Sequence, residues 1–274
     1  PMRSAPAGSR KTPASTSASP RAAAGASQRV RRTKQLGALQ PRPDVLALPE
    51  TALTGYFLEG GVREVARTAG ELFADLQRTY LAACGAHAPP LDIAVGFYER
   101  YRDRLYNSAL YATLGTEDEG PKTKDQRPKT KDQELASSGS RFGPLSFVLG
   151  PWSGIRHVHR KVFLPTYNLF DEARFVSEGR QIAAFDTRWG RAAMLICEDA
   201  WHSLSGTAAA MDGAQVVFVL SASPARGAHG ARPDNVEHWE DLLHRIADEH
   251  GVFATPVSYT HLRAHETDSY LVCR

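Results

Sequence analysis

The stretch Leu195-Ile196-Cys197-Glu198-Asp199-Ala200-Trp201 decides what we expect of this chain, because an apolar strand ends there on a thiol. Two upstream segments end in a similar way. Residues 46–50 place Glu50 at a second strand end, and residues 157–161 place Lys161 at a third. Cleavage of an amide needs a nucleophile, a group that transfers its proton, and a cation for the oxyanion. We therefore predict that Glu50, Lys161 and Cys197 form a catalytic triad.

In this triad Glu50 would take the thiol proton and return it to the leaving amine. The Lys161 ammonium group beside Cys197 is expected to favour the thiolate form of the cysteine. The structural alternative is that Cys197 is only a small apolar residue at a strand end, the commonest role of a buried cysteine. The ordered series of three segments favours the catalytic interpretation.

Composition is that of a globular protein, with 274 residues and 42% hydrophobic residues. The net charge of +3 is misleading, because residues 1–34 carry eight Lys and Arg and no acid. Subtracting eight from 33 leaves 25 basic against 30 acidic residues in the body. This balance argues against a nucleic-acid surface on the folded part.

The three cysteines cannot build a disulfide framework, and no signal peptide or membrane span is visible, so we expect a cytoplasmic protein. Residues 1–37 are rich in Ala, Ser and Arg and are predicted to be disordered, with a basic nucleic-acid-binding arm as the alternative. Residues 38–257 form the predicted domain. It contains a low-complexity loop insertion at 115–143, where the unit beginning at Pro121 repeats at Pro128. Residues 258–274 look non-native and resemble a translated sequencing adapter.

Apolar periodicity within the domain predicts strands that alternate with helices. The predicted helices cover residues 62–84, 204–212 and 235–250. The predicted strands cover residues 45–48, 91–98, 105–114, 157–163, 182–187, 192–197, 216–220 and 252–257. This alternation favours a layered α/β fold.

Four segments in this order carry a family resemblance: residues 48–56, 106–109, 159–165 and 195–199. With them, roughly residues 44–257 resemble the carbon-nitrogen hydrolase, or nitrilase, superfamily. The resemblance implies a four-layer α-β-β-α sandwich that lacks family strands at both ends and has low stability. It also implies that Glu50 is the general base, that Lys161 steadies the tetrahedral intermediate, and that Cys197 forms a thioester. No metal or organic cofactor is needed by this scheme.

Within the superfamily, residues 161–175 and 197–201 are most similar to the glutaminase domain of glutamine-dependent NAD synthetases. This likeness implies that Glu172 is an additional carboxylate near the triad. It also implies that a further set of side chains lines the amide pocket or contacts substrate: Tyr56, Tyr167, Glu198, and Ser221 or Ser223. The alternative is that these tyrosines cover the core edge and that the two glutamates hold loops. The chain lacks a Ser-Gly-Gly pyrophosphate loop, so a free-standing amidase fits equally well.

The predicted function is thiol-dependent hydrolysis of a small linear amide, with glutamine as first candidate substrate. Pairing of two copies through the outer helices is also expected by resemblance. One alternative is a metal hydrolase that uses His157 and His159, with Cys197, Asp199 and His202 as further ligands. Lys161 argues against it, because its charge on the same strand face as His159 would oppose a dication. The other alternative is an inactive fragment with a nucleic-acid-binding head.

Overall fold

The computed structural model describes residues 42–56, 61–116, 153–167, 171–223 and 234–258. The predicted disordered head, nearly all of the loop insertion at 115–143 and nearly all of the tail at 258–274 lie outside these residues. Those three assignments stay predictions. Among the described helices, none has the length and apolar character that crossing a bilayer requires.

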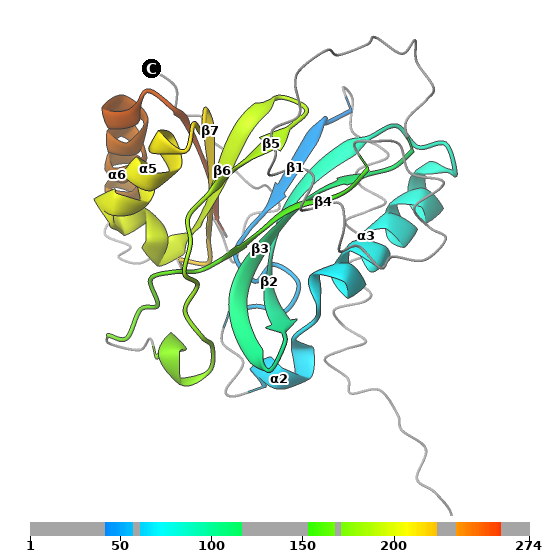
Figure 1. The fold of residues 1–274 in the computed structure, drawn as a ribbon, viewed down its shortest axis with the longest axis horizontal. Helices are drawn as coiled ribbons and strands as arrows, with labels where there is room; N and C mark the ends of the chain where they lie inside the picture. Colours follow the sequence, from blue (N-terminus) through cyan, green and yellow to red (C-terminus); the bar gives the residue numbers. More distant parts are fainter. Residues whose placement is uncertain (1–41, 57–60, 117–152, 168–170, 224–233, 259–274) are drawn as a thin grey trace, which may run out of the picture.

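Two four-stranded sheets form the centre of the described fold (Figure 1). The first sheet has the order β1-β2-β3-β4, with a parallel β1/β2 pair and antiparallel pairs beyond it. The second has the order β5-β6-β7-β8, with an antiparallel β5/β6 pair followed by parallel pairs. The strands of the first sheet are β1 (Val45–Leu48), β2 (Leu91–Tyr101), β3 (Arg104–Leu114) and β4 (Gly154–Arg160). Those of the second are β5 (Ala184–Thr187), β6 (Gly190–Ile196), β7 (Val216–Ser221) and β8 (Phe253–Ser258).

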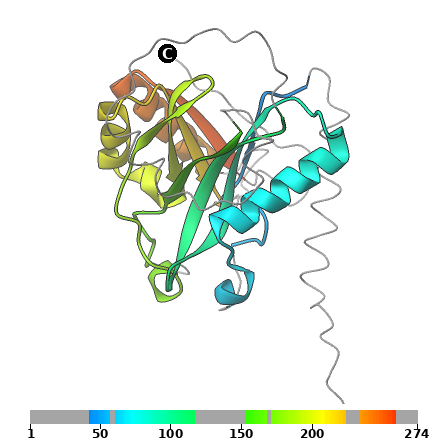
Figure 2. The ribbon, with the colours of Figure 1, turned by 45° about the vertical axis from the view of Figure 1, so that its right-hand side comes forward.

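Helices cover the outer faces of both sheets, which confirms the predicted four-layer α-β-β-α sandwich (Figures 1 and 2). Helix α3 (Ala69–Cys84) packs on the first sheet, and α5 (Ser203–Met211) and α6 (Asp234–His250) pack on the second. Shorter elements are α2 (Val62–Val65) and the 3₁₀ helices η2 (Glu172–Arg174) and η3 (Cys197–Trp201).

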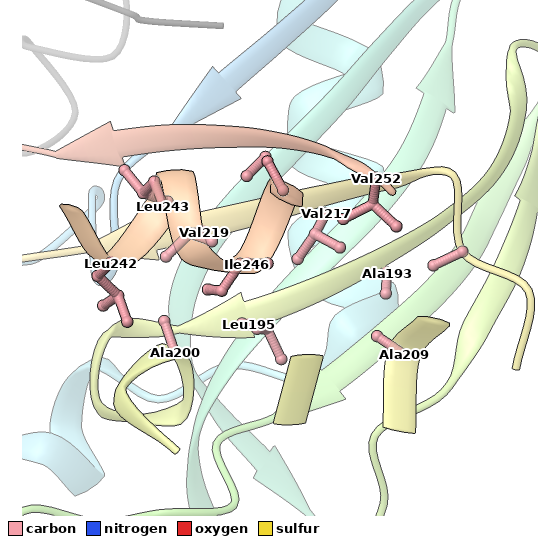
Figure 3. Close-up of a cluster of buried hydrophobic side chains, with 13 residues drawn as sticks. Ala193, Leu195, Ala200, Ala209, Val217, Val219, Leu242, Leu243, Ile246 and Val252 are labelled. Carbon is pink, nitrogen blue, oxygen red and sulfur yellow. The ribbon is translucent and has the colours of Figure 1, made fainter. Parts of the chain in front are cut away.

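Strand β6 is buried on both faces from Ala192 to Ile196, which explains the uninterrupted apolar sequence of these five residues. Leu195 belongs to the buried cluster between this sheet and its outer helices, which also includes Leu243 and Ile246 of α6 (Figure 3). Its neighbours Met194 and Ile196 face the first sheet and pack in a core between the sheets that includes Tyr111. The strand is therefore anchored on both sides up to the residue that precedes Cys197.

Two predicted elements have different bounds in the structure. The single helix expected over 62–84 is divided, because Thr68 begins α3 with a capping box in which its side chain and that of Glu71 bond each other's main-chain N–H. The strand expected over 157–163 ends at Arg160. Lys161 is therefore the first residue after the carboxyl end of β4, which agrees with its predicted place at a strand end.

Candidate active site

Glu50 and Lys161 meet in the interior at the ends of β1 and β4. Glu50 Oε1 lies 2.9 Å from Lys161 Nζ, and both side chains are fully buried. The same ammonium group lies 2.9 Å from Glu172 Oε2. Two carboxylates therefore share one buried cation, and burial is tolerated because the charges are paired.

Asn107 of β3 joins the two carboxylates from the other side. Its Nδ2 atom donates to Glu50 Oε1 at 2.7 Å and to Glu172 Oε1 at 2.9 Å. The remaining oxygen of Glu50, Oε2, accepts from the main-chain N–H of Ala222 at 2.8 Å. Ala222 follows β7, so Glu50 is bonded to both sheets and its orientation is fixed.

The charges of Glu50, Glu172 and Lys161 shift one another's pKa values. Burial alone would lower the pKa of Lys161, but the charges of Glu50 and Glu172 raise it above its ordinary value. Burial raises the pKa of Glu172, and the charge of Glu50 adds to this, whereas the Lys161 ammonium opposes it. Lys161 therefore remains a cation at neutral pH.

Cys197 follows β6 directly and opens η3 with a positive φ of 45°. This left-handed conformation is uncommon outside glycine and is found most often where a site requires it. The Ser221 hydroxyl donates to the Cys197 sulfur at 3.6 Å and accepts from the main-chain N–H of Ser223 at 3.0 Å. A hydrogen bond thus connects the thiol to Ser221, the last residue of β7.

The expected thiolate is not what the structure supports. Burial and the charge of Glu50 raise the pKa of the Cys197 thiol to about 12, and Lys161 lowers it by less. The Lys161 ammonium group does favour the thiolate, but burial and the Glu50 carboxylate each have the larger, opposite effect. Cys197 is therefore a thiol at neutral pH, and it needs a base in contact with it to become a nucleophile.

The other side chains predicted to contact substrate fall into two groups. Tyr56 lies beside Lys161 and Glu172, since its ring centroid is 5.8 Å from Lys161 Nζ and a hydrogen bond joins it to Glu172. Tyr167 and Glu198 form a separate pair beside Cys197, in which the half-exposed Tyr167 hydroxyl donates to Glu198 Oε2 at 2.7 Å. Their contacts with substrate remain predictions, as does that of Ser223.

Asn107 had no predicted role. Its amide is fully buried in the structure, and the only signal in the sequence was a polar residue inside a predicted strand. Gly96 of β2 had no predicted role either. A Cβ atom there would lie 2.5 Å from the Glu50 Cα atom, so only glycine allows the Glu50 turn to cross this strand.

The histidines of the alternative metal site have other partners. His159 Nε2 lies 2.8 Å from Asp199 Oδ2, and the His157 ring stacks on Phe185 with centroids 4.6 Å apart. Within the described residues, no group of three or more His, Cys, Asp or Glu side chains could hold a metal ion.

Residues 22–271 match the carbon-nitrogen hydrolase family, which is most of the chain. The chain belongs to the carbon-nitrogen hydrolase family. As a member of this family it is assigned to hydrolases that act on carbon–nitrogen bonds.

The relatives of this carbon-nitrogen hydrolase differ in how much of the chain they match. The glutamine-dependent NAD(+) synthetase of Acinetobacter baylyi is 37% identical over 67 residues, which is 24% of this chain and 12% of that protein. The solved glutamine-dependent NAD+ synthetase from Acinetobacter baumannii matches 92% of this chain and 38% of its own, with a TM-score of 0.58 and 20% identity. Saccharomyces cerevisiae Nit3, of the nitrilase superfamily, gives a TM-score of 0.59 at 17% identity over 93% of this chain and 78% of its own. The structural likenesses show the shared fold.

Proposed function

We propose that this carbon-nitrogen hydrolase releases ammonia from a small linear amide through a thioester on Cys197, with glutamine as first candidate substrate. The observation that carries the proposal is the buried contact of Glu50 with Lys161, beside a thiol that these two charges perturb. The likeness to glutamine-dependent NAD synthetases supports glutamine as the amide.

In the first half of the reaction the Cys197 sulfur bonds to the amide carbon while the thiol proton passes to Glu50. Lys161 stabilises the resulting oxyanion, together with a main-chain N–H beside Cys197. The carbon–nitrogen bond then breaks, and Glu50 gives the proton to the leaving ammonia. A partly exposed thiol with a raised pKa fits this order, because substrate can reach it and the base is needed at the moment of attack.

In the second half, Glu50 takes a proton from water, whose oxygen bonds to the thioester carbon. The carbon–sulfur bond breaks, the carboxylic acid leaves, and the sulfur regains its proton. Apart from substrate and water, the steps use only Glu50, Lys161, Cys197 and the main-chain N–H beside Cys197. Tyr167 and Glu198 would meet the polar end of the substrate beside Cys197.

Ammonia release from glutamine, asparagine and short aliphatic amides tests this proposal. Cys197→Ser is expected to reduce release to background, because the hydroxyl is a far weaker nucleophile in this setting. Cys84→Ser, on α3, is the matched control and should leave the rate unchanged. Iodoacetamide should abolish release whereas a chelator should not. Full activity of the Cys197→Ser protein, or loss of release with chelator, would contradict the proposal.

A further inference from the structure

Asp199 is a fully buried carboxylate that binds the segments carrying Lys161 and Cys197. Its Oδ1 atom accepts from the main-chain N–H groups of Val162 and Phe163, both at 2.9 Å. Its Oδ2 atom accepts from the main-chain N–H of Ile196 at 3.0 Å and lies 2.8 Å from His159 Nε2. Every one of these partners is within two residues of Lys161 or Cys197.

This link matters because the two residues belong to different sheets. Lys161 follows β4 of the first sheet, and Cys197 follows β6 of the second. Hydrogen bonds between neighbouring strands therefore do not fix the position of one relative to the other. The Asp199 carboxylate supplies a direct polar connection between the two strand ends.

Asp199 also closes the turn in which Cys197 adopts its positive φ. The bond from the Ile196 N–H to the Asp199 side chain spans this turn, as a short-range cap does. A residue held in a sparsely populated conformation needs surrounding bonds to keep it there. The same carboxylate thus holds the nucleophile turn and the loop after Lys161.

The environment of Asp199 keeps it ionised. Burial alone would raise the pKa of this carboxyl, but the hydrogen bond and charge of His159 and the main-chain N–H groups lower it below its ordinary value. These donors offset the free energy of burying an ionised carboxylate. Removing one of them therefore destabilises the protein more than removing a hydrogen bond between neutral groups does.

We infer that the His159–Asp199 pair is a positioning device that fixes the Lys161 ammonium group relative to the Cys197 sulfur. The inference rests on the proposed function, in which both groups act on one carbonyl. Neither His159 nor Asp199 touches the substrate in this account. Their effect passes through Lys161 and Cys197.

His159→Phe is the first test, because it keeps an aromatic ring and removes the donor. We expect kcat for ammonia release to fall by up to about 100-fold with little change in KM, since a misplacement near 1 Å has that effect. The alkylation profile of Cys197 should also move to higher pH, because Lys161 lowers the thiol pKa and would now lie farther away. A merely structural role of His159 would not produce this shift.

His157→Phe is the matched control, since His157 is on the same strand and stacks on Phe185. It should leave kcat and the alkylation profile unchanged. His159→Gln keeps an N–H donor and should restore much of the wild-type profile. Asp199→Asn removes the acceptor of the pair instead of the donor. It should shift the alkylation profile of Cys197 in the same direction as His159→Phe does. If His159→Phe folds poorly, Asp199→Asn still tests the inference.

Equal effects of His157→Phe and His159→Phe would overturn the inference, as would a wild-type alkylation profile in both His159→Phe and Asp199→Asn. Alkylation with iodoacetamide needs only the thiol and its neighbours. If the wild-type protein released ammonia from none of the amides, the proposed function would fail, and the alkylation profiles would still decide whether this pair positions Lys161.

Discussion

Replacing Glu50 with Gln is expected to slow ammonia release by about 100- to 10,000-fold and, at the same time, to make the Cys197 thiol more acidic. The rate should fall because Gln cannot accept the thiol proton or return it to ammonia. The thiol pKa should fall because the charge of Glu50 is one of the causes that raise it. The two measurements are the rate of ammonia release and the pH dependence of Cys197 alkylation.

Cys84 provides an internal reference in the same samples, because partial unfolding of the Glu50→Gln protein would change its reactivity too. Peptide mapping should show faster alkylation at Cys197 alone. Glu64→Gln, at an exposed position of α2, is the matched control and should change neither quantity. Slower alkylation of Cys197 in the Glu50→Gln protein would mean that Glu50 does not act on the thiol as described.

Lys161→Met is expected to abolish ammonia release and to lower the free energy of unfolding by about 3–5 kcal/mol at neutral pH. The variant leaves the buried carboxylates of Glu50 and Glu172 without their shared cation. The pKa of Glu172 is already raised in the wild-type protein, and loss of Lys161 removes a cause that lowers it. Denaturant unfolding of both proteins measures the difference.

The sign of the pH dependence follows from the raised pKa of Glu172. The pKa of Glu172 is higher in the folded protein than its ordinary value of 4.5. The protonated side chain therefore favours the folded state below pH 4.5, and this contribution to stability is lost as the pH rises through the pKa of the folded protein. The instability of Lys161→Met should therefore diminish as the pH is lowered from neutral toward that value. Adding Glu172→Gln to Lys161→Met should recover part of the loss at neutral pH. A difference between the variant and wild type that does not change with pH would contradict this explanation.

Sequence patterns were sufficient for the elements that place the site. Strands β6 and β7 are buried on both faces, so their apolar runs were distinct, and the residues that end them were correspondingly clear. Glu50 and Cys197 were each recognisable as residues that follow an apolar segment, whereas Lys161 follows a segment with two histidines and two arginines and was marked by its place at a strand end. That they lie close together was predicted only from the order of the three segments along the chain. In the structure Glu50 contacts Lys161, although the two are 111 residues apart in the sequence.

The sequence could not show which neighbours control the chemistry. The protonation of Cys197 depends on burial and on Glu50 as well as on Lys161, and only the folded arrangement ranks these effects. The Asn107 bridge depends on two carboxylates from distant segments. The divided helix is different, because the Thr68–Glu71 capping box was present in the sequence and marked the start of α3.

Whether a thioester forms on Cys197 can be decided by intact-mass analysis of the wild-type protein, quenched in acid during turnover of glutamine or of another amide that releases ammonia. We predict an adduct with the mass of the substrate less ammonia, located by peptide mapping at Cys197 and absent from the Cys197→Ser protein. Ammonia release with no adduct at Cys197, or with an adduct at another residue, would contradict the account.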